Sequence, residues 1–173
     1  MIEYSVLTRL WREEGIRHLP MGQLAQHLDF DLNVLSVCAA MPAEVPVLLT
    51  THIGGDIRLF SLIRIEVEQR LNVELIVLGS VPRDPGMLYC LDCETGAVLL
   101  LCLDGPSLET VNSDFTTWVE FLYRLQRLLE TADSRQGCID AADALERDLA
   151  RLDPIAFADP ESWWSTAFGL LKA

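Results

Sequence analysis

Short apolar runs, several alternating with polar residues at a period of two, occupy the middle of the chain, and this pattern is typical of β-strands. The predicted strands cover residues 47–53, 57–65, 73–79, 87–92, 97–103 and 108–111. The first two are expected to form a hairpin across the glycines at positions 54 and 55. The link between 87–92 and 97–103 ends in Gly96, which suits a hairpin with a left-handed residue there.

Helical periodicity marks both ends of the chain. Residues 2–14 have apolar side chains at helical spacing, and residues 115–129 form one apolar stripe at intervals of three and four. The stripe consists of Phe115, Trp118, Val119, Leu122, Leu125 and Leu129. Ser113, or Asn112 beside it, is the predicted N-cap, with Asp114 in the first turn.

Two further helices are predicted near the C-terminus. Residues 139–152 form one, which ends before Pro154 because proline disfavours a helical residue in front of it. The last begins with Asp159 as cap and Pro160 in the first helical position, and its apolar face includes Trp163 or Trp164. The elements predict an α+β fold, with a mostly antiparallel sheet of about six strands flanked by N- and C-terminal helices. We expect one domain over residues 1–173 because no linker or repeat interrupts the pattern.

The charge balance is strongly acidic. The chain has 13 Lys and Arg against 26 Asp and Glu, which gives a net charge of −13. Residues 1–86 contribute −4 and residues 87–173 contribute −9. Such a field repels nucleic acid and anionic membranes, and attracts basic protein partners. Simple solubility explains the same charge equally well.

Targeting signals are missing from the pattern of the first residues. Glu3 lies early, and no basic start leads into an apolar block as in a signal peptide. No apolar run reaches the ~18–20 residues of a membrane-spanning helix. We therefore expect a cytoplasmic protein.

The cysteines and histidines do not form a recognisable centre. Five cysteines, an odd number, argue for reduced thiols rather than a disulfide framework. Cys90 and Cys93 form a single CxxC without the further ligands of a zinc site. His52 lies on a predicted strand, but the sequence contains no GxSxG-type nucleophile elbow with which it could act. The glycine turns lack a phosphate-binding pattern. No metal, cofactor or catalytic residue is therefore predicted.

Acidic residues gather around the predicted hairpin and the following helix start. They are Asp92, Glu94, Asp104, Glu109 and Asp114. Turn and cap roles already account for several of them, so catalysis is disfavoured. A solvated rim and a partner-binding rim remain as interpretations. Trp163 and Trp164 are adjacent and cannot share a helix face, so one is expected in the core and the other nearer the surface. An exposed tryptophan is a typical partner contact, and Trp164 is the candidate.

The order of several segments resembles the SUKH superfamily. The segments are Leu78-Gly79, Leu88-Tyr89-Cys90-Leu91-Asp92, Thr95-Gly96-Ala97-Val98 and Val111-Asn112-Ser113-Asp114-Phe115, followed by Trp118-Val119 and Leu122. The tail, with Leu152-Asp153-Pro154-Ile155-Ala156-Phe157 and Pro160-Glu161-Ser162-Trp163-Trp164, resembles the ending of the fourth SUKH subgroup. A long tail rich in Asp, Glu and Trp departs from the pattern.

The resemblance implies a non-enzymatic immunity protein of a bacterial polymorphic toxin system. Such a protein neutralises a cognate toxin by occluding its site, and the toxin is frequently a nuclease or a nucleic-acid deaminase. We expect a basic protein partner, no nucleic acid, no membrane, and a monomer or weak homodimer. The alternatives are an acidic secretion chaperone or other interaction adaptor, which would act as a dimer, and an enzyme with an unrecognised site between Asp92 and Asp114.

Overall fold

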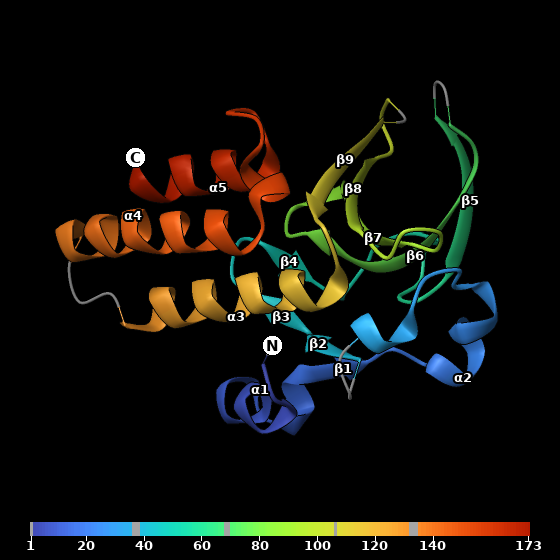
Figure 1. Ribbon diagram of the computed structural model, residues 1–173, viewed down its shortest axis with the longest axis horizontal. Helices are drawn as coiled ribbons and strands as arrows, with labels where there is room; N and C mark the ends of the chain where they lie inside the picture. The colour runs from blue at the N-terminus through green and yellow to red at the C-terminus, as the bar shows by residue number, and fades with distance from the viewer. Residues whose placement is uncertain (1, 36–38, 68–69, 106, 132–134) are drawn as a thin grey trace.

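The computed structural model describes residues 2–35, 39–67, 70–105, 107–131 and 135–173. It confirms the α+β class, because helices flank a sheet whose registered strand pairs are all antiparallel. Among the described residues the sheet has seven strands, close to the six predicted (Figure 1). They are β3 (Glu44–Val45), β4 (Leu49–Thr50), β5 (Leu62–Val67), β6 (Arg70–Val81), β7 (Asp84–Asp92), β8 (Val98–Cys102) and β9 (Ser107–Asn112). A separate two-stranded sheet joins β1 (Ile16–His18) to β2 (Ala40–Pro42).

The helices lie mainly at the two ends of the chain. They are α1 (Tyr4–Trp11), α2 (Met21–Leu24), α3 (Phe115–Thr131), α4 (Arg135–Leu152) and α5 (Trp163–Lys172). Short 3-10 turns cover Glu13–Gly15, Ala25–His27, Leu32–Val34 and Pro154–Phe157, the last being η4. Figure 1 shows α3, α4 and α5 as one layer beside the sheet. Among the described residues, no helix is both long and apolar enough to cross a membrane.

Strand β6 is the longest strand and organises the sheet. One edge of β6 pairs with β7, and the other edge pairs first with β5 and then with β4. Leu62 of β5 faces Ile76, and Thr50 of β4 faces Ser80. The predicted hairpin between 47–53 and 57–65 is therefore wrong. The chain leaves the sheet after Thr50 and returns to the same edge of β6, so β4 and β5 follow one another there.

The turn between β7 and β8 is as predicted. Gly96 has φ +77°, in the left-handed region that glycine adopts at no steric cost. A Cβ atom at this position would lie 2.9 Å from the ring of Phe30. The turn therefore requires glycine both for its backbone angle and for the close approach of Phe30.

Two helix starts differ from the prediction. Helix α3 begins at Phe115, and its cap is Asp114, whose Oδ1 accepts the Thr117 N–H at 2.8 Å. The Asn112 side chain is instead bound to Asp153 and Trp164, and the Ser113 hydroxyl donates to Asp114 Oδ2 at 3.5 Å. Helix α5 begins only at Trp163, after a turn in which Asp159 accepts the Glu161 N–H at 2.7 Å.

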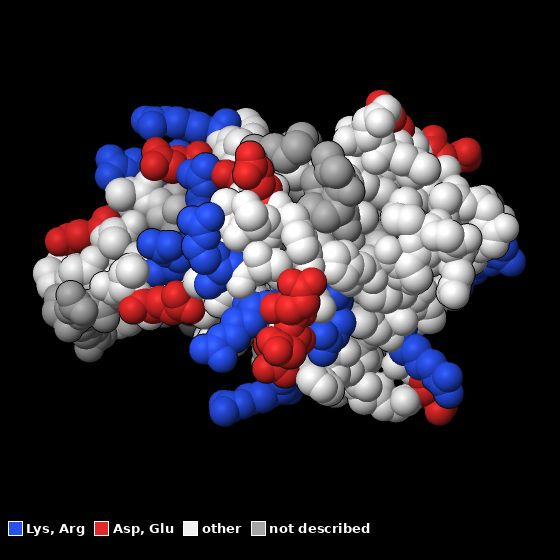
Figure 2. Space-filling view, turned by 90° about the horizontal axis from the view of Figure 1, so that it is seen from below, with Lys and Arg blue, Asp and Glu red and all other residues white. Residues whose placement is uncertain are grey.

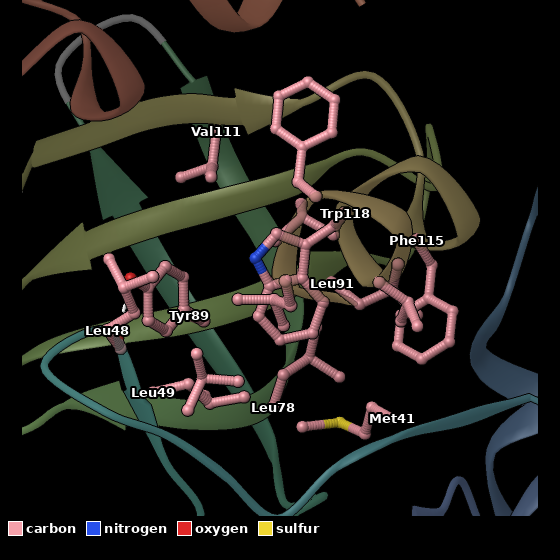
Figure 3. Packing of buried hydrophobic residues seen from close by; sticks show 14 of the residues in the cluster. Met41, Leu48, Leu49, Leu78, Tyr89, Leu91, Val111, Phe115 and Trp118 are labelled. Atoms are coloured by element: carbon pink, nitrogen blue, oxygen red, sulfur yellow. Dashed lines mark hydrogen bonds between the residues drawn. The ribbon is translucent and has the colours of Figure 1, made fainter. Parts of the chain in front are cut away.

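Apolar side chains fill both faces of the sheet. On the helix-covered face, Tyr89 and Leu91 of β7 pack against Phe115 and Trp118 of α3 (Figure 3). Alternate residues of the same strands, such as Leu88 and Cys90, form a second cluster on the opposite face. That second cluster is bordered by half-buried isoleucines from β5 and the segment before it. The strands are therefore apolar on both sides, because each face of the sheet carries a cluster of buried side chains.

Candidate functional site

The predicted acidic rim does not exist as one surface. Asp92 is 2% exposed, and its Oδ1 accepts the Glu94 N–H at 3.0 Å, so it shapes the turn. Glu94 is exposed in the turn before β8, and Asp104 is exposed in the turn after it. A five-residue strand lies between those turns, which separates the two carboxylates by roughly 15 Å or more.

The other two predicted acids are used inside the fold. Glu109 is half-buried in β9, and its Oε1 accepts the Trp163 N–H at the start of α5. Asp114 is the N-cap of α3. Of the five acidic residues, only Glu94 and Asp104 are exposed on the surface.

The candidate contact Trp164 is fully buried and cannot meet a partner directly. Its indole Nε1 donates to Asn112 Oδ1 at 3.0 Å, and its ring packs 5.2 Å from that of Phe121. Trp163 is half-buried and has its ring edge-on to Tyr89, with centroids 5.9 Å apart. One tryptophan is buried and the other lies nearer the surface, as predicted, but the one nearer the surface is Trp163 rather than Trp164.

The segments that carry the family resemblance converge on a buried carboxylate. Asp153 is 2% exposed and accepts the Asn112 side-chain N–H at 3.0 Å and the Ser113 backbone N–H at 2.8 Å. Trp164 completes the chain of bonds through Asn112. This Asp153 clamp holds β9, η4 and α5 together. The family-like residues at these positions therefore connect distant parts of the fold.

The CxxC cysteines are buried thiols. The pKa of both Cys90 and Cys93 is raised to about 12, mainly by burial, and for Cys93 the carboxylates of Glu74 and Asp92 are a smaller part of that shift. A reactive cysteine needs the opposite shift. Cys38 lies outside the described residues. In the part of the chain that the structure describes, no three metal-ligating side chains come together.

His52 does not lie on a strand. It follows β4 in an exposed loop, where its Nδ1 is 3.1 Å from Glu44 Oε1. Its side chain is 77% exposed, so nothing around it resembles the enclosed base of a nucleophilic site.

The charges are distributed unevenly over the fold. Residues 18–114, which contain the sheet, have 4 Lys or Arg and 13 Asp or Glu, a net charge of −9. The flanking helical parts have 9 and 13, a net charge of −4. On the face shown in Figure 2, Lys and Arg gather at the left and centre with Asp and Glu among them, and the right side is mostly uncharged. The larger acidic excess belongs to residues 18–114.

A feature that the sequence pattern did not reveal is the turn between β3 and β4, which we name the Val47 ridge (Pro46, Val47 and Leu48). Val47 has φ +64° and is 77% exposed, although a β-branched residue disfavours this conformation. The buried Tyr89 hydroxyl donates to the Leu48 carbonyl at 2.9 Å, which fixes the ridge against β7 (Figure 3). Burial raises the pKa of Tyr89 well above its ordinary value, so this donor stays protonated.

Two hollows flank the Val47 ridge. An apolar groove of about 230 Å³ lies between the ridge, α3 and α5, and none of its described lining residues is charged. Its main walls are Leu125, Leu129, Trp163, Phe168 and Leu171. Leu170, also in the lining, is 75% exposed. A second hollow of about 490 Å³ shares Pro46 and Val47 and adds the charged residues Glu44 and Arg83.

The sequence missed this surface because its residues come from three distant segments. Val47 and Leu48 were assigned to a strand, and Leu125 and Leu129 to a core stripe. Leu129 in fact is only half-buried and faces the groove, while Leu128 is buried in its place. An isolated "Pro-Val" between two short strands is the one local signal of an exposed turn.

These features define an α+β protein with a helix-backed antiparallel sheet, a net charge of −9 over residues 18–114 and an apolar groove beside the β3–β4 turn. The model of the SUKH-4 immunity proteins matches residues 10–169, so the chain belongs to the SUKH-4 immunity protein family. This confirms the resemblance and supports an immunity-type function. No curated protein and no solved structure matches the chain.

Proposed function

We propose that this protein binds a cognate bacterial toxin and neutralises it by covering the toxin's active site, without performing chemistry itself. Family membership supports the immunity role. The observation that carries the choice of partner is the net charge of −9 over residues 18–114. A toxin that acts on nucleic acid needs a positively charged substrate groove, and an acidic protein competes for that groove by charge complementarity.

The proposed partner is therefore a basic nuclease or nucleic-acid deaminase that acts in the cytoplasm, where we place the immunity protein as well. Charge of this size accelerates encounter with a basic partner and makes the association rate fall with salt. The protein itself acts as a monomer or weak homodimer that binds neither nucleic acid nor membranes.

The test uses the product of the neighbouring gene as the candidate toxin. Titration calorimetry with a catalytically inactive toxin is expected to give a tight complex, and co-expression with active toxin is expected to restore growth. The proposal fails if the purified toxin neither binds nor loses its activity. Light scattering measures the mass of the free protein in solution. A stable dimer would favour the secretion-chaperone alternative, and a monomer favours the immunity role.

A further inference from the structure

We propose that the toxin docks on the open edge of strand β9. An extended, basic segment of the toxin adds alongside β9, and its Lys or Arg side chains enter an acidic hollow at that edge. This inference rests on the proposed function and adds the place and chemistry of the contact. The hollow lies between β9, η4 and the start of α5, and we name it the β9 edge hollow. Its lining includes Glu109, Thr110, Ile155, Asp159 and Glu161.

Strand β9 is the last strand of the sheet, and only one of its edges is paired. That edge follows β8 from Ser107, opposite Cys102, to Asn112, opposite Val98, and no described strand pairs with the other edge. With the described residues, positions 107–111 form no backbone hydrogen bond outside the sheet. The chain just before α5 lies beside this strand (Figure 1). An unpaired edge of this kind can accept the backbone of an added segment.

The β9 edge hollow is acidic. It measures about 380 Å³, and its described lining contains three carboxylates and no cation. Glu109 and Asp159 each accept one backbone N–H, from Trp163 and Glu161 respectively, which leaves their formal charge in place. The Glu161 side chain is exposed and bonds to none of the described residues. The hollow therefore favours a cationic side chain.

The chain around the hollow does not compensate this charge. Residues 104–114 and 152–164, which supply the lining, contain six Asp or Glu and no Lys, Arg or His. Arg151, the nearest cation along the chain, does not line the hollow and pairs with Asp148 at 3.3 Å. The open edge of β5 differs, because its Arg64 and Glu66 balance each other. Charge complementarity thus assigns a basic segment to β9 rather than to β5.

Ile155 gives the hollow an apolar side. It is 53% exposed on η4 and lines the hollow together with the three carboxylates. A Lys or Arg side chain matches this combination, since its aliphatic stem packs on apolar surface while its charged head reaches the acids. The same acids disfavour a second copy of this chain as the occupant. Two β9 edges side by side would bring like charges together, which is destabilising.

The experiment measures the dissociation constant of the inactive toxin for Glu161→Lys and Ile155→Ser. E161K puts a cation where a Lys or Arg of the toxin would lie, and should weaken binding at least ~10-fold. I155S should weaken it ~3-fold or more. Both residues are exposed, so thermal denaturation should give midpoints close to that of wild type.

Each variant has a matched control. Glu14→Lys changes the net charge equally at an exposed residue that does not line the hollow. Leu170→Ser removes an apolar side chain that is 75% exposed, also outside the hollow. Both controls should change the affinity less than ~2-fold. If wild type binds tightly and E161K and I155S bind equally well, the β9 edge is not the contact, although the proposed function stands. If the candidate toxin does not bind wild type, both proposals fail.

Hydrogen exchange distinguishes the open edges of the sheet. In the complex, amides of residues 107–110 on β9 should exchange at least ~10-fold more slowly, because an added segment pairs with the outward-facing groups. Amides of residues 62–65 on β5 should be unchanged. Protection of β5 without protection of β9 would overturn the inference. So would a dimer of the free protein that I155S dissociates while the toxin affinity stays constant, because the edge would then join two copies of this chain.

Discussion

At the scale of single residues, the Asp153 clamp carries more of the fold than any predicted site residue. Its buried carboxylate forms no ion pair with the described residues, and it accepts N–H groups from Asn112 and Ser113 at the end of β9. Losing an acceptor leaves both donors buried and unpaired, which costs more than the bonds themselves. The clamp also places Trp164, so one carboxylate orders both η4 and α5 against the sheet.

We predict that Asp153→Ala lowers the free energy of unfolding by about 2–4 kcal/mol, because it orphans the Asn112 and Ser113 donors. Urea denaturation measures the change. Asp148→Ala is the control, since Asp148 is 58% exposed and forms only a surface pair with Arg151. Its effect should stay within about 0.5 kcal/mol. Equal losses in the two variants would show that the clamp is not a stabilising element.

The buried thiols give a second prediction at this scale. With a pKa of about 12, roughly one in ten thousand Cys90 side chains is a thiolate at pH 8, against about a quarter of ordinary thiols. We expect a disulfide reagent to label the half-buried Cys102 and Cys138 well before Cys90 and Cys93. Mass spectrometry of the digested protein identifies the sites, and rapid labelling of Cys90 in folded protein would contradict the burial.

The same thiols make stability fall in alkali. Their folded-state pKa is raised above the unfolded value, so the stabilisation is complete below about pH 8.5 and is lost as the pH rises toward 12. The urea midpoint should therefore decline between pH 8 and 10. The decline should be smaller in Cys90→Ala, which removes one of the two groups.

At the scale of elements, the start of α3 shows how a cap is chosen. Three polar residues in a row, Asn112, Ser113 and Asp114, are each suitable N-caps by type. The Asn112 side chain donates to Asp153, the Ser113 hydroxyl donates to Asp114, and Asp114 is the residue that caps the helix. Both the N–H and the hydroxyl of Thr117 donate to Asp114 at 2.8 Å.

We expect Asp114→Ala to destabilise the protein by about 1 kcal/mol, the usual cost of losing an N-cap. Ser113→Ala should have almost no effect, because the Ser113 side chain is exposed and its backbone N–H remains available to Asp153. Thermal denaturation of the two variants compares them directly. A larger loss in S113A than in D114A would favour the cap predicted from sequence.

At the scale of the whole molecule, the uneven charge separates attraction from docking. The sheet half has a net charge of −9 and the helical parts −4, so a basic partner approaches the sheet half first. Neutralising the exposed Asp56, Glu94 and Asp104 together should slow association with the toxin several-fold at low salt. Stopped-flow measurement of the association rate tests this.

The control neutralises three exposed acids on the helical parts, Glu14, Asp140 and Asp148. It removes the same charge from the other half, and we expect the association rate to change less than twofold. Equal slowing by the two triple variants would show that total charge, rather than its location, governs the encounter.

The sequence by itself determined the features that depend on near neighbours. The β7–β8 hairpin follows from alternation around Gly96, and α3 follows from a stripe of apolar residues at helical spacing. The order of the segments between Leu78 and Leu122, together with the tail between Leu152 and Trp164, was enough to recognise the family. Local periodicity and turn chemistry act within a few residues, so they can be read without knowing the fold.

Only the tertiary structure decided which residues face a partner. The burial of Trp164 depends on Asn112, 52 positions away, and that of Asp153 on the same residue 41 positions away. Val47 was predicted within a strand, yet the Tyr89 hydroxyl, bonded to a residue 41 positions earlier, helps hold it in an exposed turn. Exposure is a property of contacts between distant segments, so apart from Pro46-Val47 the local pattern of polar and apolar residues did not locate this turn.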